Sequence, residues 1–248
     1  MQGKFLTLEQ IRQIEELARK DHVDLMELAG EAVAKAVYDQ FDSPVSVLVL
    51  IGSGNNGGDG VAAAIELLKR QCTVTVVQVT KQVNNTTANL LAQFRSLGGT
   101  VLTAVPADLF PYMVLIDAIF GIGLHGELSE VIVHAINMIN QEHGKSLIIA
   151  VDTPSGLNPF SGEICSSVVR ADITVTFLAD KPFLHTGEAA NYSGIVSVAD
   201  LGTNVYYNQV NKNQAPQILF NRLDSMDYSS LIRIKNQLGN TFYLTQLT

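Results

Sequence analysis

The chain has 248 residues, of which 47% are hydrophobic, so it can bury the core of one large α/β domain or two small ones. A formal net charge of -8 and an isoelectric point near 5.0 argue against general binding to nucleic acids or anionic membranes. The two cysteines, Cys72 and Cys165, form no zinc or redox motif and no disulfide framework, so we expect a cytoplasmic protein. The N-terminal segment leads into a polar helix and not into the apolar core of a signal sequence. No apolar run reaches the roughly 18 residues of a membrane span.

Two helices are expected before the first strand. Residues 8–20 carry apolar side chains at helical spacing and follow a capping box made by Thr7 and Gln10. Residues 23–38 have a broad apolar face, and Gly30 inside it indicates close packing against another helix. We interpret both helices as contributing to the core and to an interface.

Beyond these helices, apolar segments rich in β-branched residues alternate with helical patterns. Strands are predicted at residues 45–51, 73–79, 100–105, 112–117, 146–152, 173–177 and 194–199, and helices at residues 59–71, 84–97 and 127–142. The alternation predicts right-handed βαβ units, with a mostly parallel sheet and helices on both of its faces. Residues 203–218 are polar and turn-rich, and one more helix is expected at residues 225–238.

The most informative stretch is residues 52–60 (GSGNNGGDG), which lies between a predicted strand and a predicted helix. Strand, glycine-rich turn and helix is the layout of a phosphate-binding turn, and five glycines in nine residues let a ligand approach the backbone. Asn55, Asn56 and Asp59 add side-chain oxygens that can bind or ligate. The stretch therefore predicts a ligand site rather than a plain surface turn.

Three familiar motifs do not fit this chain. The spacing of Gly52, Gly54 and Gly57 matches the dinucleotide fingerprint, but an NAD-dependent dehydrogenase needs an acidic residue after the second strand, where residues 78–81 are QVTK. A P-loop needs lysine and serine or threonine where residues 58–59 are Gly-Asp. A nucleophile elbow is excluded as well, because the TPSG segment after the fifth strand lacks its first glycine.

Polar residues follow the ends of several predicted strands. Asp117 closes the fourth strand, Asp152 closes the fifth, and Lys181-Pro182 lies in the loop after the sixth. Ligands of open α/β sheets bind at the carboxyl ends of the strands, so these loops should converge with residues 52–60 at one edge.

Three of the loop residues could hold a cation. Asn56, Asp117 and Ser155 offer oxygen atoms only, which suits an alkali or alkaline-earth ion better than zinc or copper. The alternative is that these polar groups only bond to the backbone of their loops.

Several segments together resemble the NAD(P)H-hydrate epimerase family, also called the YjeF N-terminal domain family. They are residues 26–30 (MELAG, with Leu28 where the family has Asn), 54–60 (GNNGGDG), 117–123 (DAIFGIG) and 151–156 (VDTPSG), with Thr176-Phe177 and Lys181-Pro182. The resemblance implies a Rossmann-like three-layer α/β/α sandwich with a mostly parallel central sheet, commonly dimeric. Its domain would span residues 1–203, with a helical segment at residues 7–41 and the core at residues 45–203. Residues 204–248 would be an extension without a catalytic domain of its own.

The family resemblance also implies an activity, epimerisation of the R and S hydrates of NADH and NADPH (NADHX and NADPHX) at C6 of the nicotinamide ring. It implies one potassium ion per subunit, bound by Asn56, Asp117 and Ser155, and it gives His125 no catalytic role. The residues implied to contact the hydrated dinucleotide are Asn55, Asn56, Gly57, Gly58, Asp59, Gly121, Ile122, Gly123, Leu124, His125, Gly126, Glu127 and Asp152. Some relatives carry a fused dehydratase, for which this chain has no room, so we expect coupling to a separate NAD(P)HX dehydratase.

Such an epimerisation needs a group that gives and takes a proton near the C6 hydroxyl. We hypothesise that Asp152 is this general acid and base and that Lys181 helps it electrostatically. We expect backbone amides of the glycine-rich loop to hold the pyrophosphate, and Asp59 to cap the following helix or to bond the ribose.

The alternative functions are a non-catalytic nucleotide-sensing or partner-binding module and an NAD-dependent oxidoreductase. The missing acidic residue after the second strand disfavours the oxidoreductase.

Overall fold

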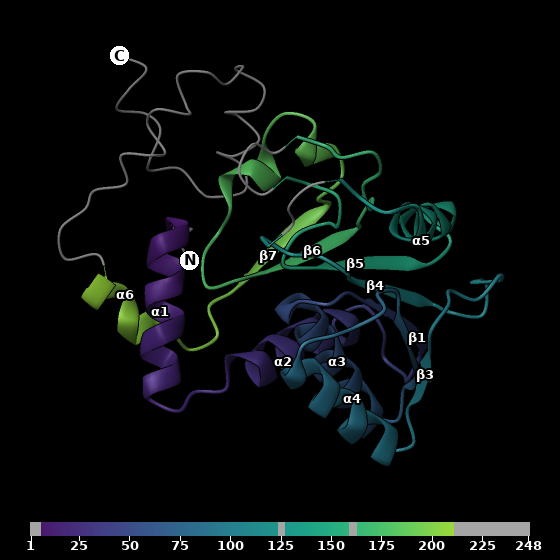
Figure 1. The fold of residues 1–248 in the computed structure, drawn as a ribbon, viewed down its shortest axis with the longest axis horizontal. Coiled ribbons are helices and arrows are strands. Elements are labelled where there is room, and N and C mark those ends of the chain that lie inside the picture. Colours follow the sequence, from purple (N-terminus) through teal and green to yellow (C-terminus); the bar gives the residue numbers. More distant parts are fainter. Residues whose placement is uncertain (1–5, 124–126, 159–162, 211–248) are drawn as a thin grey trace.

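In a computed structural model, which describes residues 6–123, 127–158 and 163–210, strands and helices alternate along the chain (Figure 1). The elements are α1 (Leu8–Lys20), α2 (Leu25–Tyr38), β1 (Ser46–Ile51), α3 (Asn55–Lys69), β2 (Thr73–Gln78), α4 (Asn85–Ser96), β3 (Thr100–Leu102), β4 (Val114–Ala118), α5 (Glu130–Gln141), β5 (Leu147–Val151), β6 (Ile173–Phe177), the short 3₁₀ helices η1 (Pro182–His185) and η2 (Ala189–Asn191), β7 (Ile195–Ala199) and α6 (Asn204–Val210). None of the described helices combines the length and the apolar character needed to cross a bilayer.

The strands form one seven-stranded sheet in the order β3-β2-β1-β4-β5-β6-β7, and every neighbouring pair is parallel. The chain runs outward from β1 to β3, returns to β4 beside β1, and then runs outward to β7. The order therefore reverses between β1 and β4, and a ligand of such a sheet binds in the crevice at that switch point.

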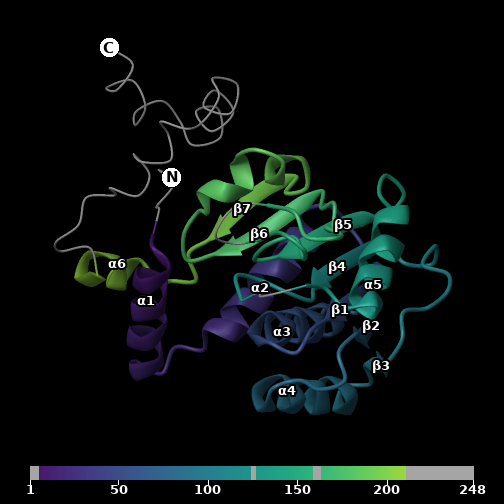
Figure 2. The same cartoon turned by 45° about the horizontal axis from the view of Figure 1, so that its top comes forward.

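Helices cover both faces of the sheet, which confirms the predicted α/β sandwich. Helices α2, α3 and α4 lie on one face and α5 lies on the other (Figures 1 and 2). One apolar cluster joins α2 and α3 to one side of the strands, and a second joins α5 to the other side. Strand β4 is buried along its whole length, as expected of a parallel strand with helices on both faces.

Helix α6 lies beside α1 at the margin of the molecule, in a region that the sequence predicted to be turn-rich (Figure 1). That prediction was wrong, because a short helix can be stabilised by packing that its own sequence does not reveal. Tyr206 of α6 is buried and donates a hydrogen bond of 2.8 Å from its hydroxyl to the carboxylate of Asp21. The helix expected at residues 225–238 lies outside the described residues.

Most predicted boundaries agree with the structure to within two residues. The exceptions are β3, which ends at Leu102 instead of residue 105, α5, which begins at Glu130 instead of residue 127, and α3. Helix α3 begins at Asn55, four residues before the predicted start, so residues 55–60 of the glycine-rich stretch are helical. Glycines weaken a helix in isolation, and packing overrides that tendency here.

Gly30 of α2 confirms the close helix packing that the sequence predicted. A Cβ atom on Gly30 would lie 2.6 Å from the backbone carbonyl carbon of Ala62 in α3, closer than packed atoms approach. The two helices therefore meet through their backbones, and this contact fixes the position of α3.

We predict that Gly30→Ala destabilises the protein. Overpacking should lower the free energy of unfolding by about 1–3 kcal/mol. This loss should outweigh the gain in helix propensity, which is about 1 kcal/mol at most. Denaturant titration measures the difference, with Glu31→Ala as the control, because Glu31 is exposed on the same helix and should change stability by less than about 0.5 kcal/mol. Equal stabilities of the two variants would contradict the close contact.

Candidate functional site

The glycines of residues 52–60 allow close contacts between this stretch and other segments of the protein, in addition to leaving room for a ligand. Cβ atoms on four of them would come within 2.6 Å of another protein atom, and the residues are Gly52, Gly57, Gly58 and Gly60. The tightest approach is at Gly52, whose Cβ would lie 2.0 Å from the carbonyl oxygen of Ile119 in the loop after β4. Only Gly54 of the five faces open space. The glycines thus bring the ends of β1 and β4 together at the switch point.

The N-terminus of α3 faces this edge. Gly54 is the N-cap residue, and no side chain accepts a hydrogen bond from the first turn. The first backbone N–H groups of a helix lack partners within the helix, so they are available to an anion. The prediction that Asp59 caps this helix was wrong, because Asp59 is the fifth residue of α3 and lies one turn beyond the cap.

The two asparagines at the start of α3 have different surroundings. Asn55 is exposed, and its side-chain oxygen accepts a hydrogen bond of 3.0 Å from Asn84. Asn56 is buried, and both its Oδ1 and Nδ2 lack a hydrogen-bond partner among the described residues. Because buried polar atoms are nearly always bonded, the side-chain amide of Asn56 is available to bind a ligand.

The loop after β4 brings Asn56 close to Asp152. A Cβ atom on Gly121 would lie 2.9 Å from Oδ1 of Asn56 and 2.9 Å from Oδ2 of Asp152. The backbone N–H of Ile122 donates a hydrogen bond of 3.4 Å to the same Oδ2. Gly121 therefore stands between two side chains that the sequence placed in the site, where any larger residue would separate them.

Asp117 and Ser155 are in direct contact, as a shared site requires. The hydroxyl of Ser155 donates to Oδ1 of Asp117 at 2.6 Å, and the backbone N–H of Ser155 donates to Oδ2 at 2.7 Å. Asp117 also accepts from the N–H of Ile119, and Ser155 Oγ accepts from the N–H of Phe120. Complete burial raises the pKa of Asp117 to about 6, although the bonds from Ser155 oppose the shift.

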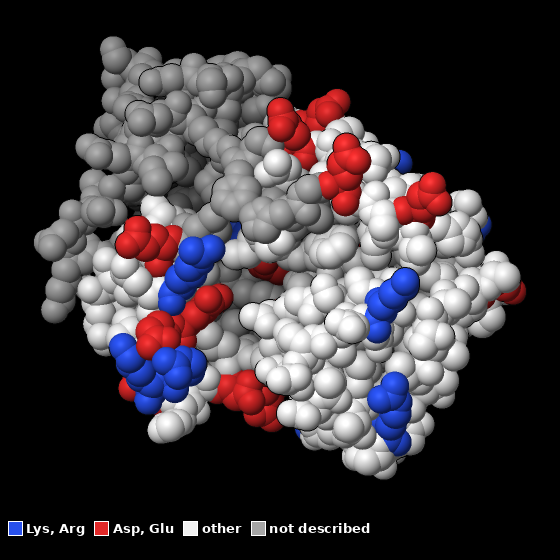
Figure 3. Space-filling view, in the orientation of Figure 1, with Lys and Arg blue, Asp and Glu red and all other residues white. Residues whose placement is uncertain are grey.

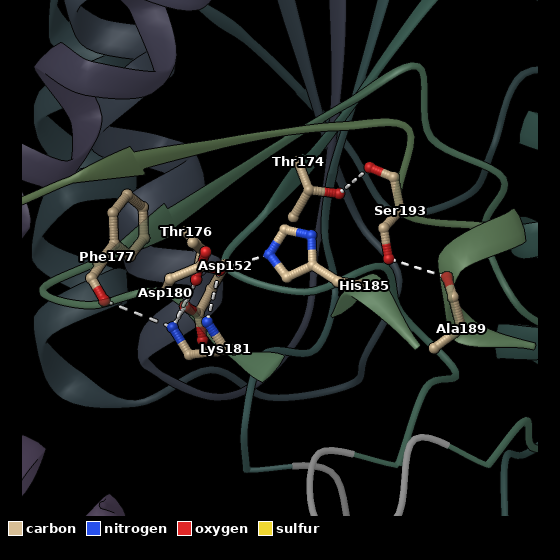
Figure 4. Close-up of polar contacts among 9 residues, drawn as sticks. All are labelled: Asp152, Thr174, Thr176, Phe177, Asp180, Lys181, His185, Ala189 and Ser193. Atoms are coloured by element: carbon tan, nitrogen blue, oxygen red, sulfur yellow. Dashed lines mark hydrogen bonds and ion pairs between the residues drawn. The ribbon is translucent and has the colours of Figure 1, made fainter. Parts of the chain in front are cut away.

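Asp152 and Lys181 form a buried ion pair at the ends of β5 and β6 (Figure 4). Nζ of Lys181 donates to Oδ1 of Asp152 at 2.7 Å, to Oγ1 of Thr176, and to the carbonyl oxygen of Phe177 at 3.4 Å. The three N–H bonds of the ammonium group thus have three acceptors. Thr176 in turn donates to Oδ1 of Asp152 at 3.2 Å, which leaves Oδ2 as the oxygen that faces Gly121.

Two tight turns aim these side chains at the site. Asp152 has a φ of 65° and Leu178 a φ of 67°, values that residues other than glycine seldom adopt. At each turn an N–H bonds the carbonyl two residues earlier, at 2.8 Å in both cases, as in a γ-turn. Strained backbone of this kind persists where the surrounding structure holds it, and it clusters at functional sites.

Two further carboxyl groups, those of Asp59 and Glu15, lie near enough to Asp152 to interact with its charge. Burial, and then the charges of Asp152, Glu15 and Asp24, raise the pKa of Asp59 well above its ordinary value. The pKa of Glu15 in α1, a residue that keeps an exposed surface, is also raised, first by partial desolvation and then by the charge of Asp152. Acidic side chains gather around the hollow between α1 and the body of the protein (Figure 3). Helix α1, read from sequence as core and interface, thus also contributes a charge near the site.

The structure brings together most of the predicted residues, but not all can be placed. Leu124, His125 and Gly126 lie outside the described residues. Glu127 lines a depression beside α5, together with His134 and Cys165, and that depression includes neither Asp152 nor Lys181. Asp180 and His185 form a buried pair next to Lys181 for which no role was predicted from the sequence. The only sequence signal for this pair was its closeness to the Lys181-Pro182 motif.

The oxygen atoms at the switch point fit a hard cation. Oδ1 of Asn56 has no partner among the described residues, and the contacts of Asp117 and Ser155 leave further lone pairs on their oxygens. A buried carboxylate at this place also needs a compensating positive charge. The donor set is therefore compatible with the potassium ion that the family resemblance implies.

The fold and the site place the chain among the doubly wound α/β proteins that bind a ligand where the strand order reverses. Residues 22–183 match the family described as YjeF-related protein N-terminus, and the chain belongs to this family.

Relatives with established names agree with this assignment. The chain is 36% identical over 185 residues to the NAD(P)H-hydrate epimerase of Limosilactobacillus reuteri (strain DSM 20016), over 72% of this chain and 85% of the relative. It is 35% identical over 198 residues to the bifunctional NAD(P)H-hydrate repair enzyme Nnr of Coxiella burnetii, and it spans 40% of that protein. The crystal structure of the yeast protein ynu0 (YNL200c) has the same fold, with a TM-score of 0.65, 22% identity, and coverage of 79% of this chain and 87% of the yeast chain.

We predict that Gly121→Ala impairs the site while Glu31→Ala, at an exposed position of α2, does not. The added methyl group at Gly121 must displace Asn56 or Asp152. Displacement of a reacting group by about 1 Å can cost about 10²-fold in rate. Turnover of hydrated nicotinamide dinucleotide by the two purified variants tests this, with thermal unfolding to verify that both are folded. Equal activities would show that Gly121 does not need to be small.

Proposed function

We propose that the protein is an NAD(P)H-hydrate epimerase, which interconverts the R and S forms of NADHX and NADPHX. The observation that carries this proposal is the buried Asp152–Lys181 pair, with the second oxygen of Asp152 directed toward Gly121 at the switch point of the sheet. The name of the Limosilactobacillus reuteri relative, of which the chain covers 85%, supports the same reaction.

The reaction requires one proton to move at the C6 hydroxyl of the substrate. In the reacting state Asp152 carries one proton on Oδ2, taken up from solution, while Lys181 still bonds Oδ1. Asp152 donates this proton to the C6 oxygen, the C6–O bond breaks with the electron pair leaving on oxygen as water departs, and the ring nitrogen lone pair stabilises the resulting iminium. The carboxylate of Asp152 then stabilises the positive ring. Water adds to either face of C6 and returns its proton to Asp152, which completes the epimerisation without net oxidation.

Lys181 and the Thr176 hydroxyl hold the other oxygen of Asp152. Their bonds to Oδ1 leave Oδ2 free to exchange the proton, and the backbone N–H of Ile122 orients this second oxygen. The burial of Asp152 and Lys181 excludes bulk water, so their charges act more strongly on the substrate. Neither residue needs to bind a redox cofactor for this chemistry.

The dinucleotide would extend from Asp152 toward the N-terminus of α3. Its pyrophosphate would accept hydrogen bonds from the uncapped N–H groups of the first turn, where the helix dipole favours negative charge. Asp59 lies one turn further along α3, so its carboxyl would bond a ribose hydroxyl rather than a phosphate. Residues 55–59 and the loop after β4 would then line opposite sides of the ligand.

Potassium would be held by Asn56, Asp117 and Ser155, where it would offset the charge of the buried aspartate and fix three loops. We further propose that the S form passes to an NAD(P)HX dehydratase, since the Coxiella burnetii relative is named a bifunctional NAD(P)H-hydrate repair enzyme. A homodimer and a cytoplasmic location remain predictions. The exposed Ile195 of the edge strand β7 offers an apolar contact for the first, and the free Cys72 and Cys165 support the second.

We predict that Asp152→Asn nearly abolishes epimerisation. Asparagine keeps the shape and tolerates the positive φ, but it cannot carry the proton, so kcat should fall about 10²–10⁴-fold. The assay supplies the R hydrate with an S-specific dehydratase and follows the NADH that reappears. Asp39→Asn, at an exposed ion pair with Lys35, is the matched control and should retain full activity.

The same assay separates the alternatives. Acceleration by the wild type supports the epimerase, whereas nucleotide binding without acceleration supports a non-catalytic sensing or partner-binding module. Near wild-type rates in Asp152→Asn would disprove the role of Asp152.

We predict that potassium stabilises the fold and that Asn56→Ala removes this effect. A tenfold excess over the dissociation constant should raise Tm by about 3–5 °C. Thermal unfolding in potassium, sodium and choline chloride at equal ionic strength measures the difference. Asn55→Ala is the control, because Asn55 bonds Asn84 and should leave the potassium effect intact. Identical Tm values in all three salts would argue against a potassium site.

A further inference from the structure

A second buried pair, Asp180 and His185, lies next to Lys181. Nε2 of His185 is 2.7 Å from Oδ1 of Asp180, and both side chains are almost completely buried (Figure 4). The reaction proposed above uses neither residue. Burying an ionisable pair is costly unless it is well bonded, so a pair retained at this place calls for an explanation.

The same oxygen of Asp180 also holds the backbone of Lys181. Oδ1 accepts a hydrogen bond of 2.7 Å from the N–H of Lys181, and the carbonyl of Lys181 accepts one of 2.9 Å from the N–H of Leu184. Asp180 and Lys181 directly precede η1, and His185 is its last residue. The Asp180–His185 contact therefore closes η1 at both ends and fixes the peptide from which the Lys181 side chain departs.

The surroundings of the pair are also held by hydrogen bonds. Thr174 of β6 donates from its hydroxyl to the carbonyl of Ser193 at 2.7 Å, and Ser193 donates from its hydroxyl to the carbonyl of Ala189 at 2.8 Å. These bonds attach η2 to β6 on the side of His185 away from Lys181, as Figure 4 shows. These bonds fix the segments that lie on that side of His185.

We infer that Asp180 and His185 are positioning residues for Lys181. They hold the backbone so that the long, flexible lysine side chain delivers its ammonium group to Oδ1 of Asp152. Because Asp180 also accepts from a backbone N–H, Nε2 of His185 serves as a donor to it. The role in turnover rests on the proposed epimerase function, whereas the positioning of Lys181 does not.

Variants of His185 test the inference. His185→Leu removes the donor to Asp180, and we expect kcat to fall by about 10- to 100-fold with KM nearly unchanged, because the reacting groups and not the binding groups move. His185→Gln provides an amide N–H in place of Nε2–H and should recover activity to within about threefold of the wild type. The control is His143→Leu, at a half-exposed histidine 3.5 Å from Asp172, which should retain wild-type kcat.

A double-mutant cycle with Lys181→Met distinguishes positioning from a general loss of structure. If His185 acts through Lys181, His185→Leu should lower kcat by less than about twofold once Lys181 is replaced. The same fold-change in both backgrounds, or unchanged kcat in folded His185→Leu, would overturn the inference.

A crystal structure of His185→Leu gives a readout that does not depend on activity. We expect Nζ of Lys181 to leave hydrogen-bond distance of Asp152, and an unchanged contact would overturn the inference. An inactive wild-type protein would instead contradict the proposed function, and the crystal structure would still decide the role of His185.

Discussion

A carboxylate removed from water needs a nearby positive charge or hydrogen-bond donors to stabilise its negative charge. The site depends on this constraint at two neighbouring strand ends. Asp152 is compensated by the ammonium group of Lys181. Asp117 receives only hydrogen bonds from neutral groups, and burial raises its pKa to about 6. The two aspartates therefore call for different partners. Asp152 already has a cation from the chain, and Asp117 suits a cation from solution, so the proposed function assigns the reacting role to the first and a structural role to the second.

The arrangement of these groups depends on close backbone contacts. Gly52 allows the end of β1 to meet the loop after β4, and Gly30 allows α2 to meet α3. Through these contacts α3 begins beside Gly121, with Asn56 directed toward Asp152 and with its first N–H groups uncapped. Catalysis by electrostatic preorganisation requires groups that do not relax during the reaction, and tight packing beneath the site supplies this rigidity.

Much of the architecture could be predicted because it follows from local patterns. The β-branched runs, the helical periodicity and the glycine stops placed most elements to within two residues, and strand–helix alternation predicted the parallel sheet. The start of α3 was misplaced because its first turn is held by packing rather than by propensity. Helix α6 was missed for the same reason, since Tyr206 is stabilised by contacts with a segment far away in sequence.

For the site, the sequence by itself determined which chemical groups are present. The predicted site residues end predicted strands or follow them, and the rule for open α/β sheets places such residues at one edge. They are Asn56, Asp117, Asp152, Ser155 and Lys181. Only the tertiary structure decided their pairing: Asp117 with Ser155, Asp152 with Lys181, and His185 with Asp180. The physical reason is that composition and spacing fix the charge of a side chain, whereas its burial and partners depend on how distant segments pack. Those two quantities decide which carboxyl can bind a cation and which can move a proton.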